Sequence, residues 1–112
     1  MALDILYPNG QILAVTPFGT AASLPDTTAV TSVASSMSNT VLLAANPDRL
    51  GATIENDSTS VLFVKLGLTA SSTSYTVRMV SLSYFEVPYG YTGIISGIWV
   101  AANGAARITE LT

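Results

Sequence analysis

The 112-residue chain contains no cysteine and no histidine. Without cysteine it has no disulfide framework, no thiolate metal site and no cysteine nucleophile. Without histidine it lacks the commonest general base and the commonest transition-metal ligand of proteins. These absences remove most routes to nucleophilic and metal-assisted catalysis. We therefore expect a protein that is not an enzyme, with no catalytic residues and no cofactor.

Charge is also scarce, since only 10% of residues are charged, against about 25% in a typical soluble domain. The basic residues, Arg49, Lys65, Arg78 and Arg107, are far apart in the sequence, so no basic cluster predicts nucleic-acid binding. No run approaches the roughly 20 apolar residues of a membrane helix, and the first residues lack the basic segment of a signal peptide. We expect no membrane partner and synthesis in the cytoplasm.

Hydrophobic residues make up 49% of the chain, which is high for a protein with so few charges. Serine and threonine, 27 residues together, could supply part of the polar surface. The alternative is that partner molecules cover much of the surface. The apolar content favours a contribution from partners.

The chain divides after residue 38. In the first part, the short apolar runs Leu3–Leu6 and Gln11–Thr16 flank an Asn-Gly turn signal, which is typical of a hairpin. Residues 20–39 are mostly Ala, Ser and Thr and have too few large side chains to form a core alone. We expect residues up to 38 to form an N-terminal arm or hairpin with a linker. Residues 30–37 are the only candidate for a short helix.

Residues 39–112 contain seven strand-like runs separated by turn signals. They are Val41–Ala45, Ala52–Glu55, Val61–Leu66, Tyr75–Met79, Tyr84–Val87, Ile94–Ala101 and Arg107–Leu111. Short strands at this spacing are typical of a sandwich or barrel. We predict an all-β fold, an antiparallel β-sandwich of the jelly-roll-like or immunoglobulin-like kind, with an extended N-terminal arm or hairpin.

Two of these runs are apolar on both faces. In Val61–Leu66 the residues Leu62, Val64 and Leu66 are the expected core positions, yet Val61 and Phe63 on the other face are also apolar. A strand of a free two-layer sandwich should show one polar face. We therefore predict an oligomer interface, formed by Val61, Phe63, Ile95 and Trp99. The alternative is that the N-terminal hairpin covers this face.

Carboxylates offer one metal-binding alternative. Glu55 and Asp57 lie two positions apart and, with Asn56 and Asp48, are the donor type that Ca²⁺ prefers. No known loop signature accompanies them, and an Asx-type turn over residues 56–58 explains the same residues. The turn is the favoured interpretation.

Aromatic residues offer a second alternative. A sugar-binding platform would draw on Tyr84, Phe85, Tyr89, Tyr91 and Trp99. Such platforms usually include several polar side chains, which are sparse here. A role in the core and in subunit contacts, where Tyr and Trp are common, is the favoured interpretation.

Two segments carry a family resemblance. From residue 46 the chain reads Asn-Pro-Asp-Arg-Leu-Gly-Ala-Thr-Ile-Glu-Asn-Asp-Ser and then Leu-Phe-Val-Lys-Leu-Gly. From residue 84 it reads Tyr-Phe-Glu-Val-Pro and then Gly-Ile-Trp. This pattern resembles small virion proteins of tailed bacteriophages over residues 39–111. The resemblance implies a virion component with a β-sandwich body, on the head, tail or fibre.

We therefore expect a capsid decoration (cement) protein that stabilises the phage shell as part of the virion. It would form a homotrimer or homodimer and bind the major capsid protein or another virion subunit. The predicted anchors of its N-terminal arm are Leu3, Ile5, Leu6, Ile12, Leu13, Val15 and Phe18. The alternatives are a tail or fibre module that binds host carbohydrate through the Tyr and Trp cluster, and a glycan-cleaving enzyme built on carboxylates.

Overall fold

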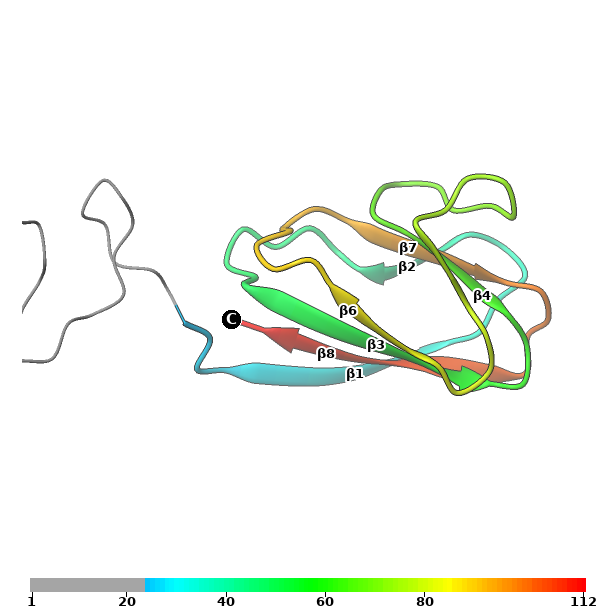
Figure 1. Cartoon of the computed structure of the whole chain (residues 1–112), viewed down its shortest axis with the longest axis horizontal. Coiled ribbons are helices and arrows are strands. Elements are labelled where there is room, and N and C mark those ends of the chain that lie inside the picture. The colour runs from blue at the N-terminus through cyan, green and yellow to red at the C-terminus, as the bar shows by residue number, and fades with distance from the viewer. Residues whose placement is uncertain (1–23) are drawn as a thin grey trace, which may run out of the picture.

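A computed structural model describes residues 24–112, which form eight strands in two antiparallel sheets (Figure 1). The first sheet has the order β1 (Thr28–Ala34), β8 (Gly104–Leu111), β3 (Gly51–Ser58), β6 (Tyr84–Val87). The second has the order β2 (Thr40–Leu43), β7 (Ile95–Trp99), β4 (Leu62–Lys65), β5 (Val77–Met79). Among residues 24–112 there is no helix with the length and apolar character needed to cross a membrane.

The all-β prediction is confirmed, and each of the seven runs predicted in residues 39–112 overlaps one of the strands β2 to β8. The turn at Asn46 is also present, and its side-chain Oδ1 accepts a 3.0 Å hydrogen bond from the backbone N–H of Asp48. The turn predicted over residues 56–58 is wrong. These residues continue β3, because Asn56 and Ser58 find buried partners inside the body.

Strand β1 corrects the boundary predicted after residue 38. Its residues pair continuously with β8, from Thr28 opposite Leu111 to Ala34 opposite Ala105. The stretch is therefore part of the first sheet and neither a linker nor a helix. An edge strand needs few large side chains, since its backbone hydrogen bonds to β8 order it and Ser and Thr suit an exposed pleated surface.

The strands pair as one long hairpin that is folded back on itself. The innermost pair is β4 with β5, followed outwards by β3 with β6, β2 with β7, and β1 with β8. The turns that join β1 to β2, β3 to β4, β5 to β6 and β7 to β8 lie at the end of the body opposite the C-terminus (Figure 1). We call this end, formed by residues 35–39, 59–61, 80–83 and 100–103, the turn end.

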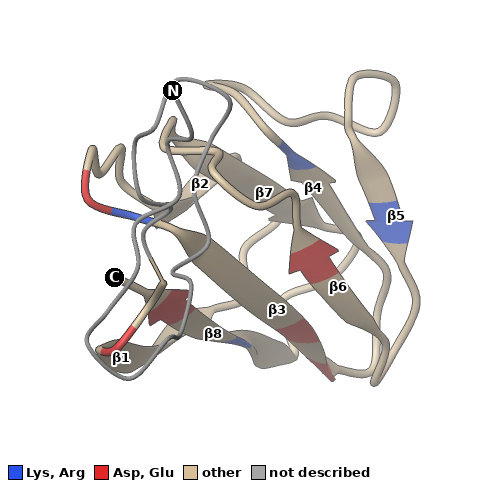
Figure 2. Ribbon diagram, turned by 60° about the vertical axis from the view of Figure 1, so that its left-hand side comes forward, with Lys and Arg blue, Asp and Glu red and all other residues tan. Residues whose placement is uncertain are grey.

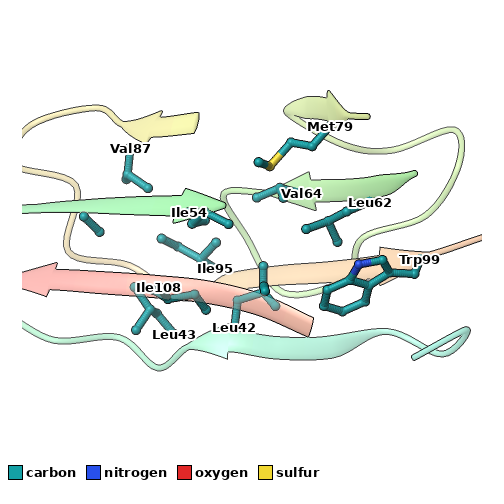
Figure 3. Packing of buried hydrophobic residues seen from close by; sticks show 12 residues of the cluster. Leu42, Leu43, Ile54, Leu62, Val64, Met79, Val87, Ile95, Trp99 and Ile108 are labelled. Carbon is teal, nitrogen blue, oxygen red and sulfur yellow. The ribbon is translucent and has the colours of Figure 1, made fainter. Parts of the chain in front are cut away.

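A single cluster of buried side chains joins the two sheets (Figure 3). The first sheet supplies Ala52, Ile54, Val87, Ala106 and Ile108, and the second supplies Leu42, Leu43, Leu62, Val64, Met79, Ile95 and Trp99. Burying one such large side chain stabilises the fold by about 1.5–3 kcal/mol. The predicted core positions Leu62 and Val64 are confirmed, and Leu66 is partly buried against the cluster.

Gly104 begins β8 beside the backbone of β3. A Cβ atom at this position would lie 2.6 Å from the Cα of Ser58 and closer still to the carbonyl oxygen of Asp57. Only glycine lets the two strands approach so closely at the turn end.

Candidate functional site

The predicted anchors of the arm lie outside the described residues. They are Leu3, Ile5, Leu6, Ile12, Leu13, Val15 and Phe18, whereas the structure describes residues 24–112. Their role in binding a partner remains a prediction.

The predicted oligomer interface divides between two places. Val61 and Phe63 are half-buried, and Phe63 lies on the outward face of β4. Ile95 and Trp99 are only 0% and 2% exposed and belong to the core. The expectation that these two side chains face a neighbouring subunit is corrected, because β7 is a central strand and its residues 95 and 99 point towards the first sheet.

A loop of the chain itself covers part of the outer face of the second sheet. The connection between β4 and β5, residues 66–76, lies over β7 (Figure 1), where the buried Ser96 Oγ donates to the carbonyl oxygens of Gly67 and Leu68. Near the other end of the loop, the ring of Tyr75 lies 4.9 Å from that of Phe63. This cover accounts for apolar residues on the outer faces of β4 and β7. The N-terminal hairpin, which we considered as an alternative cover, lies outside the described residues.

The aromatic residues do not form one platform. Trp99 is buried, and its Nε1–H donates to Asn56 Oδ1 at 3.1 Å. Phe85 and Tyr91 pack against the core, whereas Tyr84 and Tyr89 are 62% and 64% exposed. Tyr84 is the first residue of β6 and Tyr89 follows the end of that strand, so they are separated along the body.

The carboxylates of β3 lie on its outer face. Glu55 and Asp57 alternate with the buried Asn56, and Asp57 Oδ2 accepts a 2.9 Å hydrogen bond from Arg107 Nε. The described part of the chain contains no group of three or more acidic residues that could hold a metal ion. It also contains no pocket.

Asn56 is instead the centre of a buried polar network near the turn end. It is fully buried, and its Oδ1 accepts hydrogen bonds from Ser58 Oγ at 2.7 Å and from Trp99 Nε1. Its Nδ2 donates to the backbone carbonyl oxygens of Ser60, Met79 and Val80 at 2.8, 3.0 and 3.2 Å. One amide side chain thereby joins β3 to two turns and to the core tryptophan.

Arg49 forms a second network at the end near the C-terminus. Its side chain is fully buried, and its Nε lies 2.8 Å from Glu110 Oε2. The remaining guanidinium N–H groups donate to the backbone carbonyl oxygens of Ala44, Tyr91 and Gly93. Arg49 therefore fastens two loops to β8. It is a structural residue, which the sequence marked as an isolated basic residue and as part of the resembling segment that begins at residue 46.

The turn end exposes large apolar side chains. Met37, Val80, Leu82 and Val100 are 65%, 54%, 69% and 57% exposed. Met37 comes from the turn between β1 and β2, Val100 from the turn between β7 and β8, and the other two from the turn between β5 and β6. We call these four residues the turn-end patch. Hydrogen bonds tie the turns to one another, including Trp99 N–H to the Ser36 carbonyl and Ser60 Oγ to the Ala101 carbonyl.

Leu82 is the one non-glycine residue with a positive φ, 62°, in the part of the chain that the structure describes. Its backbone N–H donates to the Asn56 carbonyl at 2.8 Å, which holds the turn in place. This conformation is costly for a residue with a Cβ atom. The fold bears this conformational cost although the Leu82 side chain points into solvent and adds little packing. Because backbone strain often occurs at functional sites, the turn end is a candidate contact surface.

Comparison with known proteins identified no relative. The chain matches no protein-family model, no curated protein and no solved structure.

Proposed function

We propose that this chain is a non-enzymatic structural protein of a phage particle, and more narrowly a capsid decoration protein. In this proposal the body is a jelly roll that oligomerises and stabilises the shell. Residues 1–23 attach it to the major capsid protein or another virion subunit. The body then presents its outer surfaces to neighbouring subunits.

The strand order carries the proposal. Eight strands that fold back as one hairpin, and divide into the sheets β1-β8-β3-β6 and β2-β7-β4-β5, are the pattern expected of a jelly roll. Jelly rolls recur in viral capsid and lectin domains. Fold alone does not define function, so the assignment to a virion also depends on the resemblance of residues 39–111 to small phage proteins.

The distribution of apolar residues supports a role in assembly. The core described above is built by residues 42–108, yet the chain carries seven further large apolar residues between positions 3 and 18. The body also exposes the turn-end patch. Apolar side chains beyond those a core requires are typical of surfaces that contact other proteins.

Deletion of residues 1–20 tests the attachment. We expect the truncated chain to keep a cooperative thermal transition, because the strands and their core lie within residues 28–111. We expect it to lose attachment to particles of the phage that encodes it. Co-sedimentation of purified chain with decoration-free particles measures the attachment directly.

Two full-length variants test whether attachment depends on the apolar side chains of the arm or on the length of the arm. Replacing Ile12, Leu13 and Val15 together with serine should weaken attachment at least tenfold, since it removes apolar side chains that the proposal assigns to the contact. Replacing Thr16 and Thr20 with serine should change nothing. Unchanged attachment of the triple variant and of the truncated chain would refute this role of the arm.

Carbohydrate binding in a tail or fibre module is the second candidate, favoured by the exposed rings of Tyr84 and Tyr89. Aromatic rings in such positions stack on sugars in lectin domains. A glycan-array signal that disappears in Tyr84→Ala or Tyr89→Ala would favour this function. Trp99 is unsuitable for the test, because its replacement would damage the core.

A further inference from the structure

The body has four edge strands, and three of them are poor templates for pairing. β2 has four residues and an irregular register with β7, and β5 has three residues that include Arg78. β6 has four residues, carries Glu86 and is followed by Pro88. Short length, bulges, charges and proline are the features with which natural proteins prevent edge-to-edge association.

Strand β1 lacks all of these features. It has seven residues without proline, and its register with β8 is continuous. None of the seven is charged (Figure 2). Six of its residues are exposed, with Val30 at 72%. No described strand pairs with its outer side. An open, uncharged edge of this length is a template for another strand.

The hydrogen bonds at the two ends of β1 show which backbone groups face outwards. Thr27 and Thr112 exchange both of their N–H to carbonyl bonds, and the Ser35 N–H donates to the Gly104 carbonyl. Because inward and outward groups alternate along an antiparallel strand, odd-numbered residues are bonded to β8. The residues that direct N–H and C=O to the open side are therefore Thr28, Val30, Ser32 and Ala34.

We propose that β1 pairs antiparallel with β1 of a second copy, about a two-fold axis at Thr31. This register places Thr28 opposite Ala34 and Val30 opposite Ser32 of the other copy, so that every outward backbone group of the strand finds a partner. A register centred on Val30 or Ser32 leaves some of these groups unmatched. The two first sheets then form one continuous sheet of eight strands.

The chemistry of the strand suits a second copy of the same chain. The chain has a net charge of −3, but the uncharged β1 opposes no like charges when two copies meet. The same register places the side chain of Val30, which is 72% exposed in the single chain, on the same face of the sheet as Ser32 of the other copy. Pairing the edges thus also covers apolar surface.

This inference rests on the proposed function, in which copies of the chain assemble, and it names the surface that they share. It is also distinct in its test. Attachment to particles depends on residues 1–23 in the proposed function, whereas the dimer depends on β1 and is measured on purified protein without particles.

Disulfide trapping tests the register, because the chain has no cysteine of its own. In the proposed dimer the two Thr31 residues form a non-hydrogen-bonded pair with Cα atoms about 4.5 Å apart, a distance that a disulfide spans. We expect Thr31→Cys to oxidise to a covalent dimer. In Val30→Cys the two introduced thiols would be offset by two positions, about 7 Å along the strands, and should not link.

Proline tests the hydrogen bonds of the edge. The Val30 N–H faces the open side, so Val30→Pro removes no bond within the chain but two bonds of the dimer. We expect the wild-type chain to sediment with twice the 11.6 kDa mass of one chain and Val30→Pro to sediment as a monomer with a similar melting temperature. If this variant fails to fold, Val30→Lys tests the same edge by charge repulsion.

Three results would overturn the pairing. They are a monomeric wild-type chain at high concentration, equal disulfide trapping at positions 30 and 31, and a dimer whose affinity survives both substitutions of Val30. A monomer whose Val30 and Ser32 amides resist hydrogen exchange would identify another segment of the same chain as the occupant. A wild-type chain that attaches fully to particles but forms no dimer in solution would refute the edge pairing and leave the proposed attachment through residues 1–23 standing.

Discussion

The two ends of the body are fastened by different chemistry. At the end near the C-terminus a buried cation, Arg49, is paired with Glu110 and with backbone carbonyls. Near the turn end the neutral amide of Asn56 joins β3 to two turns and to Trp99 through hydrogen bonds. The described residues contain no buried side-chain nitrogen or oxygen without a partner.

The difference lies in what surrounds each network. The Glu110 side chain remains 18% exposed, so that the charge of Arg49 is countered at the rim of the body. Asn56 lies beside Trp99 in the interior, where an unpaired charge would be expensive. A neutral side chain with two donors and an acceptor is therefore the better connector at the turn end.

Of the substitutions in the two networks, Asn56→Leu should lower the free energy of unfolding the most. The change removes five hydrogen bonds, each worth about 0.5–1.5 kcal/mol. It also leaves the buried Trp99 indole N–H unsatisfied, at about 1–3 kcal/mol, whereas Ser58 Oγ and the Ser60 carbonyl keep their mutual hydrogen bond. We expect a loss of roughly 4–6 kcal/mol in the free energy of unfolding, measured with urea.

The matched control for this variant is Ser58→Ala. It removes one donor and leaves the Trp99 bond in place, so we expect a loss of about 1 kcal/mol. Equal losses for the two variants would contradict the central role of Asn56.

Replacing Arg49 with methionine should have the next largest effect. The substitution keeps the apolar stem but leaves Glu110 unpaired, and breaking a buried ion pair typically costs about 3–5 kcal/mol. Urea unfolding measures the loss.

Glu110→Gln is the partner variant. It keeps an acceptor near the guanidinium and leaves the carbonyl bonds of Arg49, so we expect a smaller loss of about 1–3 kcal/mol. If Arg49→Met unfolded at the wild-type urea concentration, the fastening role of Arg49 would be wrong.

Replacing Leu82 with glycine should have the smallest effect, and in the opposite direction. Glycine tolerates the positive φ, and the exposed leucine side chain contributes little packing, so we expect stabilisation by about 1 kcal/mol. For a body of this size such a change raises the melting temperature by roughly 4–8 °C.

Leu82→Ala is the control, because it keeps the Cβ atom and therefore the strain. Its melting temperature should stay close to that of the wild type. If the turn end contacts a partner protein, both variants should bind that partner more weakly, whereas only the glycine variant should gain stability. No gain in Leu82→Gly would show that the turn is not strained.

The strands of residues 39–112 were predictable because each carries a dense apolar pattern between strong turn signals. β1 was missed because its sequence, Thr-Ala-Val-Thr-Ser-Val-Ala, carries almost no such pattern. It is ordered by pairing with β8 at the other end of the chain, and a contact across so many residues leaves no local signal.

The candidate site was less predictable than the fold. The alternation of residues along β4 identified Leu62 and Val64 as core residues. In β7 the residues of both faces include large apolar side chains, so the same pattern did not show which face is buried. The buried roles of Asn56 and Arg49 depend on partners far away in the sequence, such as Trp99 and Glu110. The Asn-Asp-Ser sequence after Glu55 predicts a turn, so no local signal placed Asn56 in a strand.

By itself, the sequence determined that the body is made of short strands with an apolar core, because alternation and turn residues act over a few neighbouring positions. The tertiary structure alone decided which faces are covered, which polar side chains are buried and which long edge has no partner strand among residues 24–112. Those outcomes depend on contacts between segments that are distant in the chain. Such contacts determine the loop over β7, the Asn56 network and the exposed side of β1.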